Sequence, residues 1–317
     1  MPIPLLVQIP LDPLRLARIA AAGFEIHHAP TPAERAEMIP RLAPVLRAVL
    51  TNGATGMSAE AIATLPKLEI ICCIGVGHET VDLRAAKARG IRVTNGPATN
   101  DVTVADHTWA LILSIARNIP GADAAVRQGE WMNARGPRPI VFGKRLGIIG
   151  LGNIGRQIAE RGERGFDMEI AYHNRARRPE SPYAYLPSVK ALAEWADYLV
   201  IAAPGGAGTR HLVNAEVLEA LGPQGFLINI GRGSVVDTEA LVAALHDGRI
   251  AGAAIDVVDG EPEVPPALAA APRLIITPHI AGRSPEAMMA TASLVAANLQ
   301  AHFAGEPVKT PVPMPVD

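Results

Sequence analysis

The sequence K-R-L-G-I-I-G-L-G-N-I-G at residues 144–155 determines the fold expected for this chain. An apolar run ends there in Gly150, Gly152 and Gly155, which have the G-x-G-x-x-G spacing of a dinucleotide-binding strand–turn–helix unit. The first glycine allows the sharp turn, the second lets the backbone approach a pyrophosphate, and the third lets the helix pack closely on the strand. Backbone N–H groups at the start of the helix then face the diphosphate.

The sequence around the glycines favours this interpretation over a glycine-rich turn without a ligand. Ile158 and Ala159 fit the buried face of a helix, and residues 168–173 (M-E-I-A-Y-H) are predicted to form the next strand. About half of the 317 residues precede the fingerprint, so we expect another domain in front of it.

The composition is typical of a soluble, globular protein. Of the 317 residues, 49% are hydrophobic and 19% are charged, which suits two domains with apolar cores. The formal net charge of −2 gives no reason to expect nucleic acid or a membrane surface as a partner. No apolar stretch approaches the roughly 20 residues of a membrane span, and the first residues lack the features of a signal peptide.

Cys72 and Cys73 are the only cysteines, and they are adjacent in the apolar run I-I-C-C-I-G. Neighbouring residues of a strand point to opposite faces, so we expect two buried thiols rather than a disulfide. Such thiols suit the reducing cytoplasm, where we expect the protein to be located. The nine histidines show no paired spacing with cysteine or carboxylate, so we expect no metal site.

Strand-like and helix-like segments alternate in both halves of the chain, which predicts an α/β fold with two Rossmann-like, doubly wound domains. A long apolar helix at residues 99–119 is expected to connect them, and the last helix, residues 285–303, to cross back to the first domain. The cofactor domain (99–283) is then inserted into a discontinuous, flavodoxin-like substrate domain (1–98 and 284–317). The expected strands are residues 5–9, 48–51, 69–74 and 92–94, then six near Leu146, Glu169, Tyr198, Phe226, Gly252 and Leu274; the expected early helices are residues 13–22, 33–42, 59–65 and 83–89.

Three charged residues follow successive strands of the predicted cofactor domain. Arg232 lies in I-N-I-G-R-G-S-V-V-D, Glu261 in I-D-V-V-D-G-E-P, and His279 in I-I-T-P-H-I-A-G. Ligands of doubly wound sheets bind outside the carboxyl ends of the strands, so these side chains are expected to converge. A guanidinium can hold a carboxylate, an imidazole can transfer a proton, and a carboxylate can orient that imidazole. Taken singly, each residue also fits a surface ion pair or an ordinary loop position.

Together with other segments they resemble the D-isomer-specific 2-hydroxyacid dehydrogenase family over nearly the whole chain. The matching segments are G-V-G followed by V-D at residues 75–82, N-G-P at 95–97, G-L-G-N-I-G, N-I-G-R-G-S-V-V-D, D-V-V-D-G-E-P and T-P-H-I-A-G. The resemblance implies that Arg232 binds the carboxylate and carbonyl of a 2-oxo acid, that His279 is the acid/base, and that Glu261 is its partner. It also implies substrate contacts from the backbone of Val76 and Gly77, a nicotinamide contact from Asp256, and a homodimer.

The end of the second strand of the cofactor domain determines which nicotinamide cofactor we expect. An NAD-binding unit usually carries Asp or Glu there, about 20 residues after the glycines, for the ribose 2′-hydroxyl. This chain has His173-Asn174-Arg175 instead, and an amide and a guanidinium suit a 2′-phosphate. We therefore expect a preference for NADP(H), with NAD(H) possible; the alternative is a solvated basic loop, above all at Arg177 and Arg178.

The expected ligand-binding residues fall into two sets. The cofactor set comprises Gly150, Gly152, Asn153, Ile154, Gly155, His173, Asn174, Arg175, Ala203, Pro204, Thr209, Ile230, Arg232, Asp256, His279 and Gly282. The substrate set comprises Gly75, Val76, Gly77, Arg232, His279 and Arg283. Trp131 and Met132 are expected either to line the pocket, directly or across a dimer interface, or to pack in a core.

The branch of the family most similar to this chain is the NADPH-dependent glyoxylate/hydroxypyruvate reductases. Departures from the usual family pattern occur at residues 205–208 (G-G-A-G), at Val258-Asp259 and at Arg283. The alternatives are an aryl-pyruvate, phosphoglycerate or formate dehydrogenase of the same architecture and, by fold analogy alone, a non-catalytic NAD(P)H-sensing protein. A phosphoglycerate enzyme needs a further cationic site, for which the first domain offers little beyond Arg84 and Arg92, and formate chemistry does not need the acid/base histidine.

Overall fold

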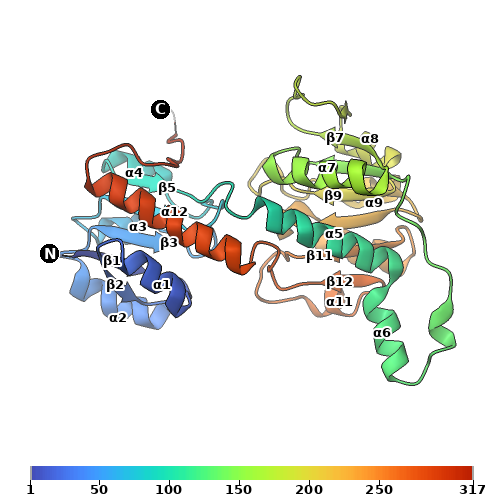
Figure 1. The fold of residues 1–317 in the computed structure, drawn as a ribbon, viewed down its shortest axis with the longest axis horizontal. Coiled ribbons are helices and arrows are strands. Elements are labelled where there is room, and N and C mark those ends of the chain that lie inside the picture. The colour runs from blue at the N-terminus through green and yellow to red at the C-terminus, as the bar shows by residue number, and fades with distance from the viewer. Residues whose placement is uncertain (1, 316–317) are drawn as a thin grey trace. The chain divides into compact units, whose positions relative to one another are not determined.

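The computed structural model describes residues 2–315 of the chain, which divide into two compact units. Unit 1 lies within Met1–Asn100 and Arg283–Asp317, and unit 2 is Asp101–Gly282. Each unit is built around one β-sheet whose paired strands are all parallel, with helices as the connections (Figure 1). The expected fold class, two Rossmann-like α/β domains with one inserted into the other, is confirmed.

Unit 1 has a five-stranded sheet in the order β2-β1-β3-β4-β5, the flavodoxin-like arrangement. Apolar residues that alternate along the strands pack in two separate cores, because successive side chains point to opposite faces. Leu6, Val49 and Ile71 belong to one core, and Leu5, Leu50 and Ile70 belong to the other. Its elements are β1 (Ile3–Val7), α1 (Pro13–Ala20), β2 (Phe24–His28), α2 (Pro32–Leu42), β3 (Ala48–Thr51), α3 (Ala59–Ala63), β4 (Ile70–Cys73), α4 (Leu83–Ala88), β5 (Arg92–Thr94) and α12 (Pro285–Phe303).

The last helix, α12, belongs to unit 1 although it follows unit 2 in the sequence. Ser284 caps its first turn, since the side-chain oxygen accepts a hydrogen bond from the backbone N–H of Ala287. Ala292, Val295 and Leu299 are buried in the same core as residues of β1, β3 and β4. Burial of this face holds the C-terminal segment on the first sheet.

Unit 2 has a seven-stranded sheet in the order β12-β11-β10-β9-β6-β7-β8. Its first six strands in chain order follow the arrangement of dinucleotide-binding sheets, with β6 next to both β7 and β9. The elements are α5 (Asp101–Arg117), α6 (Ile119–Arg127), β6 (Arg145–Ile149), α7 (Asn153–Phe166), β7 (Glu169–His173), β8 (Ala184–Tyr185), α8 (Val189–Trp195), β9 (Tyr198–Ile201), α9 (Ala215–Leu221), β10 (Phe226–Asn229), α10 (Thr238–His246), β11 (Gly252–Ile255), α11 (Pro266–Ala269) and β12 (Leu274–Ile276), with 3-10 turns at Asn133–Arg135 and Gly233–Val235.

Four elements differ from the sequence-based expectation. Strand β2 was not expected because it is an edge strand in which only Phe24 is buried, so its apolar pattern is weak. Strand β8 has two residues and also lies at an edge. The expected helix over residues 99–119 begins at Asp101 and ends at Arg117, because Asn118 adopts a left-handed conformation with φ 51°. A separate helix, α6, then starts with Pro120 in its first turn, where a missing N–H costs nothing.

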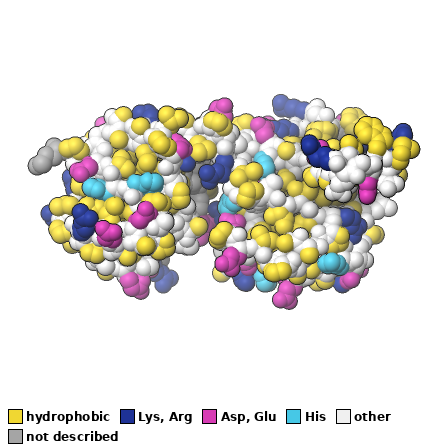
Figure 2. Space-filling view, turned by 90° about the horizontal axis from the view of Figure 1, so that it is seen from below, with side chains coloured by type: hydrophobic (Ala, Val, Ile, Leu, Met, Phe, Trp, Pro, Cys, Tyr) yellow, Lys and Arg dark blue, Asp and Glu magenta, His cyan; other side chains and the backbone are white. Residues whose placement is uncertain are grey.

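Cys72 and Cys73 are both free and buried, and they lie in the two different cores of unit 1, as expected for neighbours on a strand. Burial raises the pKa of each thiol to about 12. Within residues 2–315 no helix is long and apolar enough to span a membrane. On the face drawn in Figure 2, basic and acidic side chains are interspersed rather than segregated by sign.

Candidate active site

The predicted site residues of unit 2 lie at the carboxyl edge of its sheet. Because the paired strands are all parallel, the loops that follow them leave the sheet on the same side. Gly150 follows β6, and Asn174 follows β7. Arg232, Asp256 and His279 come after β10, β11 and β12, respectively. The sheet therefore brings residues from distant parts of the sequence to one edge.

The glycine loop has the backbone geometry that its spacing predicts. Gly150 has φ 99°, and a Cβ there would lie 2.7 Å from the backbone nitrogen of Ala203. A Cβ on Gly155 would collide with the carbonyl oxygen of Gly150. A Cβ on Gly152 would meet nothing within 4 Å. Gly152 is also the N-cap of α7 and provides no side-chain cap, so space and N–H groups are available for a diphosphate beside this helix.

The residues after β7 are tied to the glycine loop. The side-chain oxygen of Asn174 accepts a hydrogen bond from the N–H of Leu151 at 2.7 Å. Because that oxygen faces the loop, the amide NH₂ group of Asn174 remains for another partner. Tyr185 of β8 donates to the carbonyl of Asn174 at 3.3 Å and stacks against the ring of His173. The short strand β8 thus orients the position that is predicted to select the cofactor.

The arginines after β7 differ in what they contact. The backbone of Arg178 is held by the hydroxyl of Tyr172, and its guanidinium pairs with Glu180 at 3.4 Å. The side chains of Arg175 and Arg177 are exposed, and neither forms an ion pair with another residue in the described part of the chain. Arg178 therefore fits a structural loop position, whereas the predicted contact of Arg175 with a 2′-phosphate stays a prediction.

Arg232 is positioned by the turn that follows β10. The side chain of Asn229 donates to the carbonyl of Arg232 at 3.0 Å and accepts from the N–H of Gly231, also at 3.0 Å. A Cβ on residue 205 would lie 2.9 Å from Cγ of Arg232. Gly205, one of the departures from the family pattern, therefore makes room for the arginine side chain.

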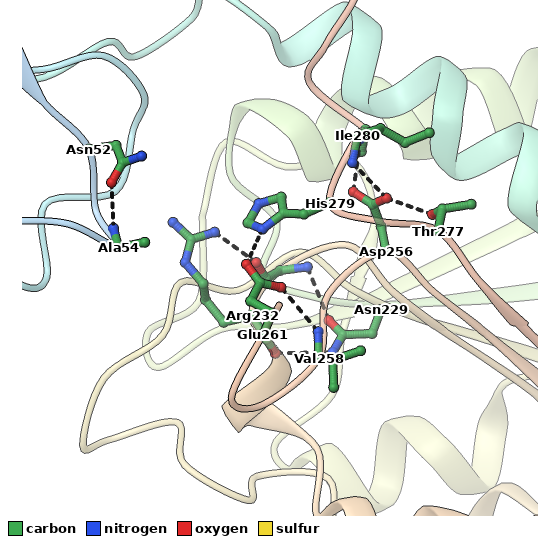
Figure 3. A network of polar contacts seen from close by, with 12 residues as sticks. Asn52, Ala54, Asn229, Arg232, Asp256, Val258, Glu261, Thr277, His279 and Ile280 are labelled. Carbon is green, nitrogen blue, oxygen red and sulfur yellow. Dashed lines mark hydrogen bonds and ion pairs between the residues drawn. The ribbon is translucent and has the colours of Figure 1, made fainter. Parts of the chain in front are cut away.

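His279 and Glu261 form a hydrogen-bonded ion pair through Nδ1 of the imidazole and Oε1 of the carboxylate (Figure 3). The other oxygen of Glu261 accepts from the N–H of Val258 at 3.3 Å. Burial alone would raise the pKa of Glu261, but the hydrogen bond from His279, the Val258 N–H and the charge of Arg232 outweigh it and lower the pKa below 4.5. A carboxylate only accepts, so Nδ1 carries a hydrogen and Nε2 is the nitrogen left to exchange a proton with a ligand.

Asp256 is buried, with 1% of its surface exposed, and both carboxylate oxygens have partners in the loop that carries His279. Oδ1 accepts from Thr277 Oγ1 at 2.6 Å and from the N–H of Ile280 at 2.9 Å (Figure 3). Oδ2 accepts from the N–H of Ala281 at 2.8 Å. The predicted contact of Asp256 with the nicotinamide stays a prediction, and the structure adds a role in holding this loop.

The other predicted cofactor residues are placed around the same edge of unit 2. Thr209 donates to the carbonyl of Pro204 at 2.9 Å and so closes the loop after β9. The remaining positions start α7 or lie in the loops after β9, β10 and β12: Asn153, Ile154, Ala203, Ile230 and Gly282.

The predicted substrate residues Gly75, Val76 and Gly77 follow β4 at the carboxyl edge of the unit 1 sheet. The carbonyl of Val76 accepts from the side chain of Asn95 at 2.8 Å and lies 3.2 Å from Nδ1 of His78. These contacts fix the loop. Arg283, the first residue of the second segment of unit 1, is exposed.

Some residues that support the site were not among the predicted site residues. The sequence pointed to Asn95 only as part of the N-G-P segment, and to Thr277 only as the residue before Pro278-His279. His107, on α5, lies 3.0 Å from Thr277 through Nε2. A contact of this kind has no local sequence signal, because the two residues are 170 positions apart.

A family model of the D-isomer specific 2-hydroxyacid dehydrogenase NAD-binding domain matches residues 109–281, more than half of the 317-residue chain. The chain belongs to the D-isomer-specific 2-hydroxyacid dehydrogenase family. This dehydrogenase is therefore an oxidoreductase with a nicotinamide-binding domain, and the matched residues contain Arg232, Glu261 and His279.

Named relatives of the dehydrogenase cover most of its length. A hydroxyphenylpyruvate reductase from Plectranthus scutellarioides is 45% identical over 89% of this chain and 90% of the relative. A glyoxylate/hydroxypyruvate reductase from Arabidopsis thaliana is 43% identical over 84% of this chain and 85% of the relative. Among solved structures, an NADPH-dependent glyoxylate/hydroxypyruvate reductase from Sinorhizobium meliloti, in complex with NADP and malonate, has a TM-score of 0.90 and 38% identity, with 98% of this chain and 97% of that chain covered.

Proposed function

We propose that this dehydrogenase reduces a small 2-oxo acid, glyoxylate or hydroxypyruvate, to the D-2-hydroxy acid with NADPH. The observation that carries the proposal is the His279–Glu261 pair, which lies near Arg232 (Figure 3). These residues follow strands of the sheet whose carboxyl edge also carries the glycine loop. The names of the Arabidopsis and Sinorhizobium relatives support the same substrate class.

The roles of the three residues follow from their chemistry. The guanidinium of Arg232 binds the substrate carboxylate through two parallel hydrogen bonds and so orients the carbonyl group. Nε2 of His279 donates a proton to the carbonyl oxygen as the adjacent carbon is reduced. Glu261 fixes the tautomer of His279 and stabilises its protonated form before that transfer. The backbone N–H groups of Val76 and Gly77 are the proposed further donors to the carboxylate.

The cofactor-binding residues fit NADPH on structural grounds. Bound NADPH supplies the hydride for the reduction. The open space beside Gly152 and the uncapped start of α7 suit its diphosphate. The amide NH₂ of Asn174 and the exposed guanidinium of Arg175 suit its 2′-phosphate, which a carboxylate at this position would repel. NADH lacks that phosphate, and we propose it as the weaker cofactor.

An aryl-pyruvate is the second candidate substrate, because the relative with 45% identity is named a hydroxyphenylpyruvate reductase. A panel of glyoxylate, hydroxypyruvate and 4-hydroxyphenylpyruvate, each with NADPH, separates the two candidates by kcat/KM. Chiral chromatography of the product determines the configuration of the carbon that carries the new hydroxyl group. The proposal requires the highest kcat/KM with one of the two small acids and a D product where that product is chiral. A higher value with the aryl acid would move the assignment to the second candidate.

We also propose a cytoplasmic homodimer that forms through an exposed arm of unit 2. The arm is residues 119–142, and its apolar side chains are too exposed for core positions: Trp131 is 62% and Met132 is 70% exposed. Exposed apolar side chains that gather in one segment are typical of a protein–protein interface. The other exposed apolar residues of the arm are Ile119, Val126, Ile140 and Phe142.

A further inference from the structure

The backbone of His279 is held in an uncommon conformation. Its φ of 53° lies in the left-handed region, which a residue with a side chain rarely adopts without support. The support comes from Asp256: its carbonyl accepts the N–H of His279 at 2.8 Å, and its carboxylate accepts the N–H groups of the next two residues, Ile280 and Ala281. The direction of the imidazole therefore depends on how firmly the Asp256 carboxylate is itself held.

A chain of hydrogen bonds leads from His107 through Thr277 to that carboxylate, and the available hydrogens fix the direction of each bond. The hydroxyl of Thr277 has one hydrogen, and at 2.6 Å from Oδ1 it gives that hydrogen to the Asp256 carboxylate, which only accepts. The oxygen of Thr277 must then accept from Nε2 of His107, 3.0 Å away. Nε2 of His107 also lies 3.5 Å from Oδ1 of Asp256.

The electrostatics of Asp256 agree with this chain. Burial would raise the pKa of Asp256, but hydrogen bonds from His107, Thr277, Ile280 and Ala281 outweigh burial and lower the pKa below 3.8. The side chain of His107 is 19% exposed, so its bond is partly shielded from water. The donors thus keep the carboxylate ionised, which is the state in which both of its oxygens accept.

We propose that His107 is a positioning residue of this enzyme: it acts through Thr277 and Asp256 to hold the loop that directs His279. His107 comes from α5, outside the motifs that carry Arg232, Glu261 and His279. The inference rests on the proposed function, in which His279 donates the proton. It assigns no contact between His107 and substrate or cofactor.

The first test compares variants that remove or keep the donors. Replacing His107 by Leu or Thr277 by Val removes one hydrogen-bond donor from the chain. His279 should then be displaced, which should lower kcat by about tenfold or more. Thr277→Ser keeps the hydroxyl and should retain kcat, and His107→Gln keeps an N–H donor and should recover part of it. The Kd of NADPH, measured by fluorescence, should change much less than kcat. A matched control is H246L, which removes an exposed histidine of α10.

The second test asks whether His107 acts through His279. In the His279→Ala background, H107L should cause no further loss of kcat, since the group that it positions is absent. Equal losses in both backgrounds, or no loss in the wild-type background, would overturn the inference. A fall in melting temperature with unchanged kcat would also overturn it. Full turnover of His279→Ala would instead contradict the proposed function, so the two failures are distinguishable.

Discussion

The side-chain oxygen of Asn174 accepts a hydrogen bond from the backbone N–H of Leu151 at 2.7 Å, which joins the end of β7 to the glycine loop. The bond fixes which end of the amide faces the loop. It leaves the NH₂ group available at the position where an NAD-binding unit usually has a carboxylate. We therefore expect this one residue both to stabilise the glycine loop and to favour the cofactor with a 2′-phosphate.

Two substitutions of Asn174 separate these effects. Asn174→Ala removes the bond to Leu151, and since a hydrogen bond contributes about 0.5–1.5 kcal/mol, the KM values of NADPH and NADH should both rise by roughly 2- to 10-fold. Asn174→Asp keeps the acceptor but repels a 2′-phosphate, so it should raise the KM of NADPH alone. Initial rates at varied concentrations of NADPH and of NADH give the two KM values, and their ratio measures the selectivity. An equal effect of Asn174→Asp on both cofactors would show that residue 174 does not select between them.

Arg175 is predicted to bind the 2′-phosphate directly. Arg175→Asp should raise the KM of NADPH by about 10- to 100-fold, the range expected for a charge-assisted hydrogen bond of about 1.5–3 kcal/mol, with little effect on NADH. Arg177→Asp is the control, because it makes the same charge change at another exposed arginine of the loop and should have a much smaller effect. An unchanged KM of NADPH in Arg175→Asp would remove this residue from the phosphate site.

The pH dependence follows from the lowered pKa of Glu261. Its folded pKa lies below the ordinary 4.5, so its support for protonated His279 is complete at neutral pH and is lost only as pH falls through that lowered value. Glu261→Gln removes the support at neutral pH. The kcat for reduction at neutral pH should then fall by about tenfold or more, because the group that orients the proton donor is lost. An equal kcat in both enzymes would show that the pair does not support the proton donor.

The exposed arm predicts a change in oligomeric state. Replacing Trp131 and Met132 by Glu introduces charge where we expect an apolar interface, so sedimentation velocity should show a shift from dimer to monomer. Leu14→Glu is the control, because Leu14 is 73% exposed on α1, outside the arm, and this variant should remain dimeric. A monomeric wild-type protein at all concentrations, or equal dissociation of the control, would contradict the assignment of the interface.

Local patterns predicted much of the fold because each depends on residues close in sequence. The spacing of Gly150, Gly152 and Gly155 defines a backbone geometry, and the bounds of α12 at residues 285–303 follow from its apolar run. Edge strands such as β2 and β8 were missed because few of their side chains are buried.

The candidate site residues that could be predicted are also those with a local sequence pattern. Arg232, Glu261 and His279 lie in recognisable local segments, whereas the hydrogen bond from His107 to Thr277 joins residues 170 positions apart and depends on the packing of α5. Only the folded chain shows such a contact.

The most direct test of the central claim is the initial rate of NADPH oxidation with hydroxypyruvate, measured beside NADH at equal concentration. The absorbance band of the reduced nicotinamide reports the rate for both. We predict rapid oxidation of NADPH, slower oxidation of NADH, and a loss of kcat of roughly 10²–10⁴-fold in His279→Ala, the usual contribution of a general acid. Turnover with NADH alone would contradict the cofactor assignment, and no turnover of hydroxypyruvate or glyoxylate with either cofactor would contradict the proposed function.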